Sequence, residues 1–238
     1  MRASGRLAAQ VRDAIAKEVV PGAVTRDLSE HAGEMIRELG GKSAFLGYRG
    51  YPGEICISVN EAVVHGVPDD RRIQLGDIVS IDVGVEYEGF IGDTAETVMV
   101  GVADPETIRL VRTTRAALDV AIDTARAGRR LSDISHAIET TAKGAGLSVV
   151  RDFVGHGIGR EMHEEPQIPN FGAPGRGPKL KPGMTMCFEP MLNLGGSGVE
   201  VLDDGWTVLT RDRSLSAHFE HTVAIRDGEA EVLTASQE

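Results

Sequence analysis

The chain has 238 residues, with 36 acidic and 25 basic side chains and a net charge of −11. A hydrophobic fraction of 41% predicts a folded globular protein and excludes a disordered one. The acidic excess disfavours nucleic acid and anionic membranes as primary ligands, because both require a basic face. Charges recur within the first twenty residues, which argues against a signal peptide or a membrane helix, so we expect a cytoplasmic protein. Two widely separated cysteines, Cys56 and Cys187, are expected to be reduced.

The first forty residues predict two helices. Apolar side chains recur every four residues from Leu7 to Val19, and Pro21-Gly22 ends this pattern. A second run from Leu28 to Leu39 has spacings of three and four residues and ends at Gly40-Gly41.

The rest of the chain repeats this order of elements. Residues 54–101 predict strands, residues 105–127 and 131–145 predict two further helices, and a strand-rich stretch follows Gly146. Each half therefore contains two helices and then antiparallel strands. We expect an α+β fold of two similar halves, in which helices cover one side of a curved antiparallel sheet.

Two aspartates on a predicted hairpin are the first chemical signal. The segment SIDVGVEYEGFIGDTAETV predicts two strands around a turn near Tyr87, Glu88 and Gly89. A turn centred between Tyr87 and Glu88 would place Asp82 opposite Asp93, with their Cβ atoms about 5 Å apart. Carboxylates at that separation repel each other unless a cation lies between them. The alternative is a pair of exposed turn residues, but Asp82 lies within the apolar run IVSIDVGV.

Histidine and glutamate occur in three further segments. VGHGIGREMHEEP contains His156 and His163 among glycines that allow close backbone approach. GMTMCFEPM and SAHFEHTVAI contain Glu189 and Glu220 in apolar, strand-like surroundings, where a charge is costly unless it is paired or bound to metal. Each segment alone could be structural, and the two histidines that flank Glu220 are interpreted as core-edge or surface residues. Together, one histidine and four carboxylates suit a divalent metal, and without an HExxH motif the site would be assembled from distant segments.

The sequence resembles a known family in these segments. The order Asp82, Asp93, His156, Glu189, Glu220 is similar to the five metal ligands of the pita-bread metallopeptidases. The segments GYRGYPGEICISVNEAVVHGVPDD, GHGIGREMHEEPQIPNFG and LKPGMTMCFEPM resemble the type I, bacterial-type, methionine aminopeptidases, and the resemblance covers nearly the whole chain from residue 43. It implies the pita-bread fold, with pseudo-symmetric halves of roughly 1–102 and 103–238 in one catalytic domain, 1–238. The chain lacks the long helical insertion between His163 and Glu189 that would mark the type II enzymes.

The resemblance also implies a metal centre and a reaction. Asp82 would bind one ion alone, Asp93 and Glu220 would bridge two ions, and His156 with Glu189 would complete the second. The two divalent ions would be Co, Mn, Fe or Zn, and the sequence does not select among them. The implied reaction is removal of the N-terminal methionine from nascent polypeptides whose second residue is small, by a metal-activated water.

Further residues are assigned roles by the same resemblance. His65 and His163 would be catalytic histidines that face the substrate, and Glu189 would carry the proton from the water to the leaving amine. The pocket for the first side chain would also be lined by Phe45, Tyr48, Tyr51, Val64, Met162 and Trp206. Such apolar, aromatic and thioether groups suit a methionine side chain. The alternative is that they are core residues, which taken alone is the better interpretation for Val64 and Trp206.

Two competing functions remain open at this stage. One is an Xaa-Pro aminopeptidase-like peptidase on the same metals, and the other is a binding protein that kept the fold and lost the metals. Nascent polypeptide N-termini are the implied partners of a monomer. Contact with the ribosome is a further expectation that no basic segment in the sequence supports.

Overall fold

The computed structural model of the chain describes residues 1–236. Its four α-helices are α1 Arg2–Glu18, α2 Thr25–Glu38, α3 Pro105–Thr124 and α4 Leu131–Gly144. All four were predicted from apolar spacing, with ends that differ by a few residues. The start of α3 has a local cause, because the Asp104 side chain accepts a hydrogen bond from the Thr107 amide and Pro105 supplies a helical φ.

One large antiparallel sheet spans the molecule. Its main path runs β1-β4-β5-β14-β9-β7-β8, while β2 pairs with β4 and β15 pairs with β14. The bounds in chain order are β1 Lys42–Ser43, β2 Cys56–Val59, β4 Ile78–Tyr87, β5 Phe90–Met99, β7 Gly155–Gly157, β8 Glu164–Ile168, β9 Thr185–Phe188, β14 Glu220–Ala224 and β15 Glu231–Val232.

Two small three-stranded sheets and one short helix complete the fold. One sheet has the order β13-β10-β6 and the other β11-β12-β3. Their strands are β3 Ala62–Val64, β6 Ser148–Val149, β10 Met191–Asn193, β11 Val199–Val201, β12 Val208–Thr210 and β13 Ser216–His218, and the 3-10 helix η1 spans Tyr48–Gly50.

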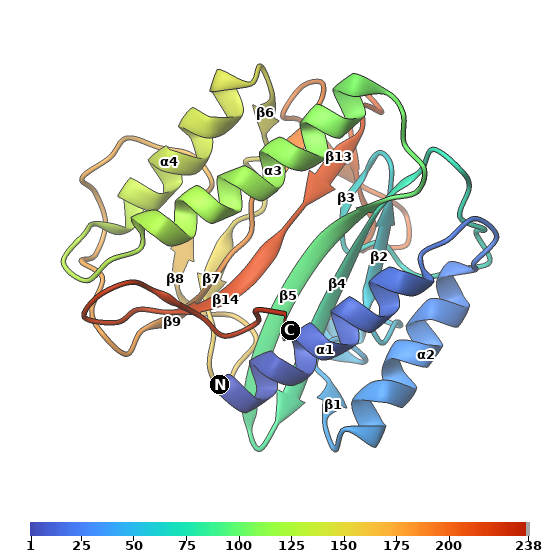
Figure 1. The fold of residues 1–238 in the computed structure, drawn as a ribbon, viewed down its shortest axis with the longest axis horizontal. Helices are drawn as coiled ribbons and strands as arrows, with labels where there is room; N and C mark the ends of the chain where they lie inside the picture. The colour runs from blue at the N-terminus through green and yellow to red at the C-terminus, as the bar shows by residue number, and fades with distance from the viewer. Residues whose placement is uncertain (237–238) are drawn as a thin grey trace.

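The helices cover one face of the large sheet (Figure 1). One hydrophobic core lies between α1, α2 and the β4–β5 hairpin and includes Ile15, Ile36 and Ile81. A second core lies between α3, α4 and strands β9 and β14, and includes Leu118 and Phe188. This arrangement confirms the predicted α+β class and leaves the other face of the sheet for polar side chains. None of the helices within residues 1–236 is long and apolar enough to cross a membrane.

The predicted register of the β4–β5 hairpin is wrong by two residues, because the turn lies one residue further along the chain than predicted. Tyr87 pairs with Phe90, so the turn is the two-residue loop Glu88-Gly89 and not one centred between Tyr87 and Glu88. Both loop residues have positive φ, 51° and 75°, as a two-residue hairpin with right-handed twist requires. Asp82 therefore pairs with Ala95, and Asp93 pairs with Gly84.

Candidate active site

The strand order of the large sheet brings the five predicted metal ligands together. Asp82 lies on β4, Asp93 on β5, Glu220 at the start of β14, Glu189 directly after β9 and His156 on β7. These are five successive strands of the sheet, although the residues span 138 positions of sequence (220 − 82).

The register aligns these side chains in two rows across the sheet. Ala95 pairs with Asp82 on one side and with Glu220 on the other, so its small side chain leaves room between the two carboxylates. Cys187 pairs with both His156 and Thr222 in the second row. Paired residues of an antiparallel sheet share a face, and Asp93 lies two residues from Ala95 on that same face. The hairpin error therefore left the predicted face of Asp82 and Asp93 unchanged.

Asp82, Asp93 and Glu220 are buried and Glu189 is largely so, and the protein offers them few hydrogen-bond donors. Burial raises the pKa of Asp82, Glu189 and Glu220 well above the ordinary range, and mutual repulsion with Asp93 raises it further. Asp82 Oδ1, Asp93 Oδ1 and Glu220 Oε1 have no hydrogen-bond partner among the described residues. Buried carboxylate oxygens without a donor carry a large desolvation cost. The chain thus holds together a set of acids that lacks positive charge.

The hydrogen bonding and burial of His156 suit a neutral metal ligand. Its Nδ1–H donates a 2.9 Å hydrogen bond to the Gly157 carbonyl, which leaves the Nε2 lone pair free. That Nε2 lies 3.5 Å from Glu189 Oε1 and 3.9 Å from Asp93 Oδ2. Burial lowers the pKa of His156 to about 4, so the ring is uncharged at neutral pH.

These residues fit a divalent-cation centre. Asp93, His156 and Glu220 place ligand atoms within 4.8 Å of one another, together with the Cys187 sulfur. A cation at this position would supply the missing partners of the carboxylate oxygens, and oxygen and imidazole ligands suit Mn, Fe, Co and Zn. Burial raises the pKa of the Cys187 thiol well above its usual range, and its sulfur lies 3.6 Å from Thr222 Oγ1. A protonated thiol is a poor metal ligand, so the carboxylates and His156 are the candidate ligands.

Two further histidines face the same space. The Tyr48 hydroxyl lies 2.8 Å from His163 Nδ1, and the His163 ring lies 4.4 Å from the His156 ring, centroid to centroid. A hydroxyl that donates to Nδ1 places the His163 proton on Nε2, where it is available as a donor. Burial lowers the pKa of His163, and it lowers that of His65 to about 4, so both rings are neutral near pH 7.

A cavity of about 350 Å³ opens beside the carboxylates. Its wall includes an aromatic group in which Tyr51 makes edge contacts with Phe45 and Trp206, at centroid distances of 6.4 and 5.1 Å. The Tyr51 hydroxyl donates to the Gly66 carbonyl at 2.8 Å, which fixes the ring in place. The predicted pocket residues that line the cavity are Phe45, Tyr48, Tyr51, Met162, Trp206, His65 and His163.

Val64 lies elsewhere, contrary to the predicted pocket. It pairs with Val208 and packs into a separate apolar cluster with Val63, Val150 and Met191. The next residue, His65, has a φ of 58°, so the chain turns there and only the histidine enters the cavity.

The fold also brings in residues that sequence reasoning did not select. Arg49, Cys56 and Gln167 line the cavity, and no pattern in the sequence pointed to them. His218 lies beside the carboxylates, with Nε2 3.8 Å from Glu220 Oε2. Here a signal existed, because residues two apart on an extended chain share a face and His218 precedes Glu220 by two.

Comparison with known proteins identifies the family. The model of metallopeptidase family M24 matches residues 1–227. The chain belongs to metallopeptidase family M24. It is 44% identical to methionine aminopeptidase 1 of Bacillus subtilis over 98% of this chain and 94% of the relative, and 45% identical to a methionine aminopeptidase of Escherichia coli K12 over 98% and 89%.

Solved structures of the family have the same fold as this chain. A crystal structure of methionine aminopeptidase from Thermotoga maritima superposes with a TM-score of 0.97 at 46% identity, and covers 99% of this chain and 95% of that one. Prolidase from Pyrococcus furiosus, at 23% identity and a TM-score of 0.79, shares the fold. The family resemblance and the pita-bread fold that the motifs predicted are therefore confirmed.

Proposed function

We propose that this M24 protein is a methionine aminopeptidase that removes the first residue of nascent polypeptides in the cytoplasm when the second residue is small. The observation that carries this proposal is the row of buried, unpartnered carboxylates and one neutral histidine beside a cavity of suitable size and lining. The methionine aminopeptidase names of relatives at 44–45% identity support the same conclusion.

The metal centre is proposed to contain two divalent ions. Asp82 would hold one ion, Asp93 and Glu220 would be shared by both, and His156 with Glu189 would hold the other. When bound, such ions polarise the scissile carbonyl and lower the pKa of water. Because ligands come from both parts of the sequence, we propose that residues 1–238 act as one catalytic domain, monomeric in solution.

Three side chains around the metal centre have separate catalytic roles. Glu189 accepts the proton of the attacking water and passes it to the leaving amine. His163, oriented by Tyr48, donates from Nε2–H to the carbonyl oxygen as negative charge develops there. His65 forms a hydrogen bond with the scissile amide or with the amide that follows it.

The cavity accounts for the choice of substrate. The first side chain enters between Phe45, Tyr51 and Met162, which offer apolar and thioether contact to methionine. The second side chain lies between the rings of His65 and His163, so Gly, Ala, Ser, Thr, Cys, Pro and Val fit there and long side chains do not.

A peptide panel tests this function against the Xaa-Pro alternative. The metal-reconstituted protein should cleave Met-Ala-Ser, should act poorly on Met-Arg-Ser and Leu-Ala-Ser, and should not prefer Ala-Pro peptides. A chelator should abolish cleavage, and added Mn, Fe, Co or Zn should restore it. Preference for Ala-Pro peptides would establish the alternative, and the absence of both bound metal and peptide cleavage would establish a binding protein that lost the metals.

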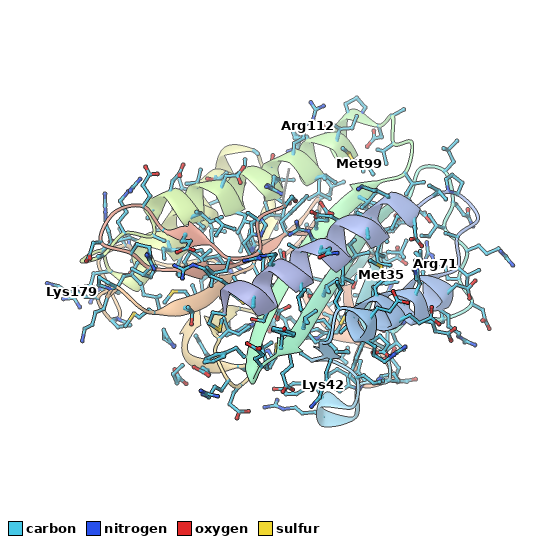
Figure 2. The ribbon with its side chains drawn as sticks, turned by 60° about the horizontal axis from the view of Figure 1, so that its bottom comes forward. Met35, Lys42, Arg71, Met99, Arg112 and Lys179 are labelled. Carbon is cyan, nitrogen blue, oxygen red and sulfur yellow. The ribbon has the colours of Figure 1, made fainter. Side chains whose placement is uncertain are left out.

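Contact with the ribosome is proposed on the basis of a basic surface that only the fold reveals. Segments 124–132 and 172–184 contain no acidic residue and lie against each other through the Gly128–Leu180 and Leu131–Pro178 backbone hydrogen bonds of 2.9 and 3.0 Å. Lys179 projects at one end of the molecule (Figure 2). Among the basic side chains of these segments, Arg126 pairs with Glu229 at 3.4 Å. Within residues 1–236 the other five have no ion-pair partner and are exposed; they are Arg129, Arg130, Arg176, Lys179 and Lys181.

Five unpaired cations on an otherwise acidic protein suit the phosphate backbone of RNA. Co-sedimentation with ribosomes should be salt-dependent and should be lost when Arg129, Arg176 and Lys179 are changed to Glu. Exchange of Arg26, Arg72 and Arg112, basic residues outside these segments, is the control. Equal sedimentation of both triple variants would remove the proposal and leave the peptidase function unaffected.

A further inference from the structure

His218 is a buried histidine with an unused ring nitrogen. Its exposed fraction is 2%, and Nε2 has no hydrogen-bond partner among the described residues. The backbone around it is fixed, because the His218 amide donates to Thr97 Oγ1 at 3.0 Å and the Thr97 hydroxyl donates to the His218 carbonyl at 2.8 Å. The pairing of His218 with Met191 in β10 holds the strand on its other edge. The free nitrogen is therefore a feature of a rigid part of the fold.

The ring nitrogen faces two carboxylates of the proposed metal centre. His218 Nε2 lies 4.0 Å from Glu189 Oε2 and 3.8 Å from Glu220 Oε2. His156 Nε2 lies 3.5 Å from the other oxygen of Glu189, Oε1. The Glu189 carboxylate thus lies between two imidazoles and presents one oxygen to each.

The distances on the His218 side suit a shared cation. They exceed the length of a hydrogen bond between nitrogen and oxygen. Two ligand atoms that each lie about 2.1 Å from one ion are at most about 4.2 Å apart, and both distances fall within that limit. Ligand atoms of Glu189, His218 and Glu220 also all lie within 4.8 Å of one another.

We infer that Glu189, His218 and Glu220 form an auxiliary site for a divalent cation such as Zn²⁺, adjacent to the two-ion centre and weaker than it. The site is weaker because it shares both carboxylates with the ligand set described above. This inference rests on the proposed function of that centre. An ion in the auxiliary site occupies the Glu189 oxygen nearest His218, and Glu189 is then unable to accept the proton of the attacking water. Excess Zn²⁺ therefore inhibits the peptidase.

Metal counting on the whole protein tests the site. Equilibrium dialysis against rising free Zn²⁺, read by mass spectrometry of the bound metal, should give three ions per chain at saturation. His218→Gln, which removes the imidazole, should give two. His221→Gln is the matched control, because His221 is also buried, on the next strand in the chain, but its Nδ1 lies 2.9 Å from Thr234 Oγ1 and it does not face the proposed site. It should give three.

Ring-nitrogen NMR supplies a readout that does not depend on activity. The ¹⁵N resonance of His218 Nε2 should shift during binding of the third ion, and the rise in Zn²⁺ that causes this shift should also lower cleavage of Met-Ala-Ser. In His218→Gln the inhibition should disappear. Saturation at two ions with an unmoved His218 resonance would overturn the auxiliary site while the proposed function stands. Absence of the first two ions, or of Met-Ala-Ser cleavage at low Zn²⁺, would instead overturn the proposed function.

Discussion

A substitution at Gly84 changes the shape of the substrate pocket and leaves every proposed metal ligand in place. It lies on β4, and a Cβ added there would be 2.6 Å from Phe45 Cε1 and 3.0 Å from Met162 Cε. Ordinary contact begins at 3.4 Å, so in Gly84→Ala the Phe45 ring has to move by about 0.8 Å (3.4 − 2.6). Phe45 and Met162 both line the cavity, so the displacement changes the space that receives the first side chain of the substrate.

The magnitude follows from the usual cost of overpacking. Insertion of a methyl group into a packed wall costs about 1–3 kcal/mol. If the substrate complex bears this cost, kcat/KM for Met-Ala-Ser falls by roughly 5- to 150-fold. The loss should be larger for methionine than for a shorter first side chain, and the metal content should not change.

Steady-state kinetics on peptides with Met, norvaline or Ala at the first position measures this effect. Gly41→Ala is the matched control, because its Cβ would lie 2.9 Å from Val85 Cγ1, in the core under α2 and away from the cavity. It should lower stability without a change in substrate preference. Unchanged kinetics in Gly84→Ala, or an equal loss for all three peptides, would refute the assignment of Phe45 and Met162 to the pocket.

Three further predictions address the catalytic histidine, the buried acids and a helix end. His163→Ala should lower kcat by roughly 10²-fold or more with the metal content intact. Tyr48→Phe should lower kcat by roughly 2- to 13-fold, which corresponds to the loss of one hydrogen bond. Loss of metal in either variant would show that His163 is a ligand. The buried carboxyls have a raised pKa, so they stabilise the metal-free fold at low pH and lose this contribution as pH rises. The histidines have a lowered pKa and are neutral in the folded and the unfolded protein above pH 7. Burial raises the pKa of Asp93 to about 7, so thermal melts should show the metal-free protein losing stability, relative to the metal-loaded protein, as pH rises toward 7. An equal rise in stability of both forms would contradict the burial argument. Gly144→Ala should raise the free energy of unfolding by about 0.4–1 kcal/mol, because alanine restricts the unfolded chain more than glycine does. Gly144 is the last residue of α4, and no atom lies within 4 Å of the added Cβ. A lower melting temperature would indicate a clash that the structure does not show.

Local periodicity was sufficient for the helices and for the face of the hairpin aspartates. The register of that hairpin was not predictable from apolar alternation alone, because alternation sets the face but not the position of the turn. The Glu88-Gly89 loop set the register, and its glycine was the available signal.

The remaining errors concern contacts between segments distant in sequence. Val64 has an apolar side chain beside a catalytic histidine, yet its pairing with Val208 turns it into a separate cluster. His218 was interpreted as a core-edge or surface residue, and its position beside Glu189 depends on the pairing of β13 with β10. The basic surface likewise forms only when the segments around Arg129 and Lys179 meet. For Val64 and for the basic surface, a tertiary pairing and not a local pattern placed the side chains, whereas for His218 only its position next to Glu220 had a local signal.

The central claim is that Asp82, Asp93, His156, Glu189 and Glu220 together bind two divalent ions. Anomalous diffraction from crystals of the protein soaked in Mn²⁺ tests this most directly, because the peaks locate the ions without reference to activity. Two peaks that share Asp93 and Glu220 are expected, and both peaks should be lost in Asp93→Asn. Peaks that contact other side chains, or an Asp93→Asn variant that keeps both ions and full activity, would contradict it.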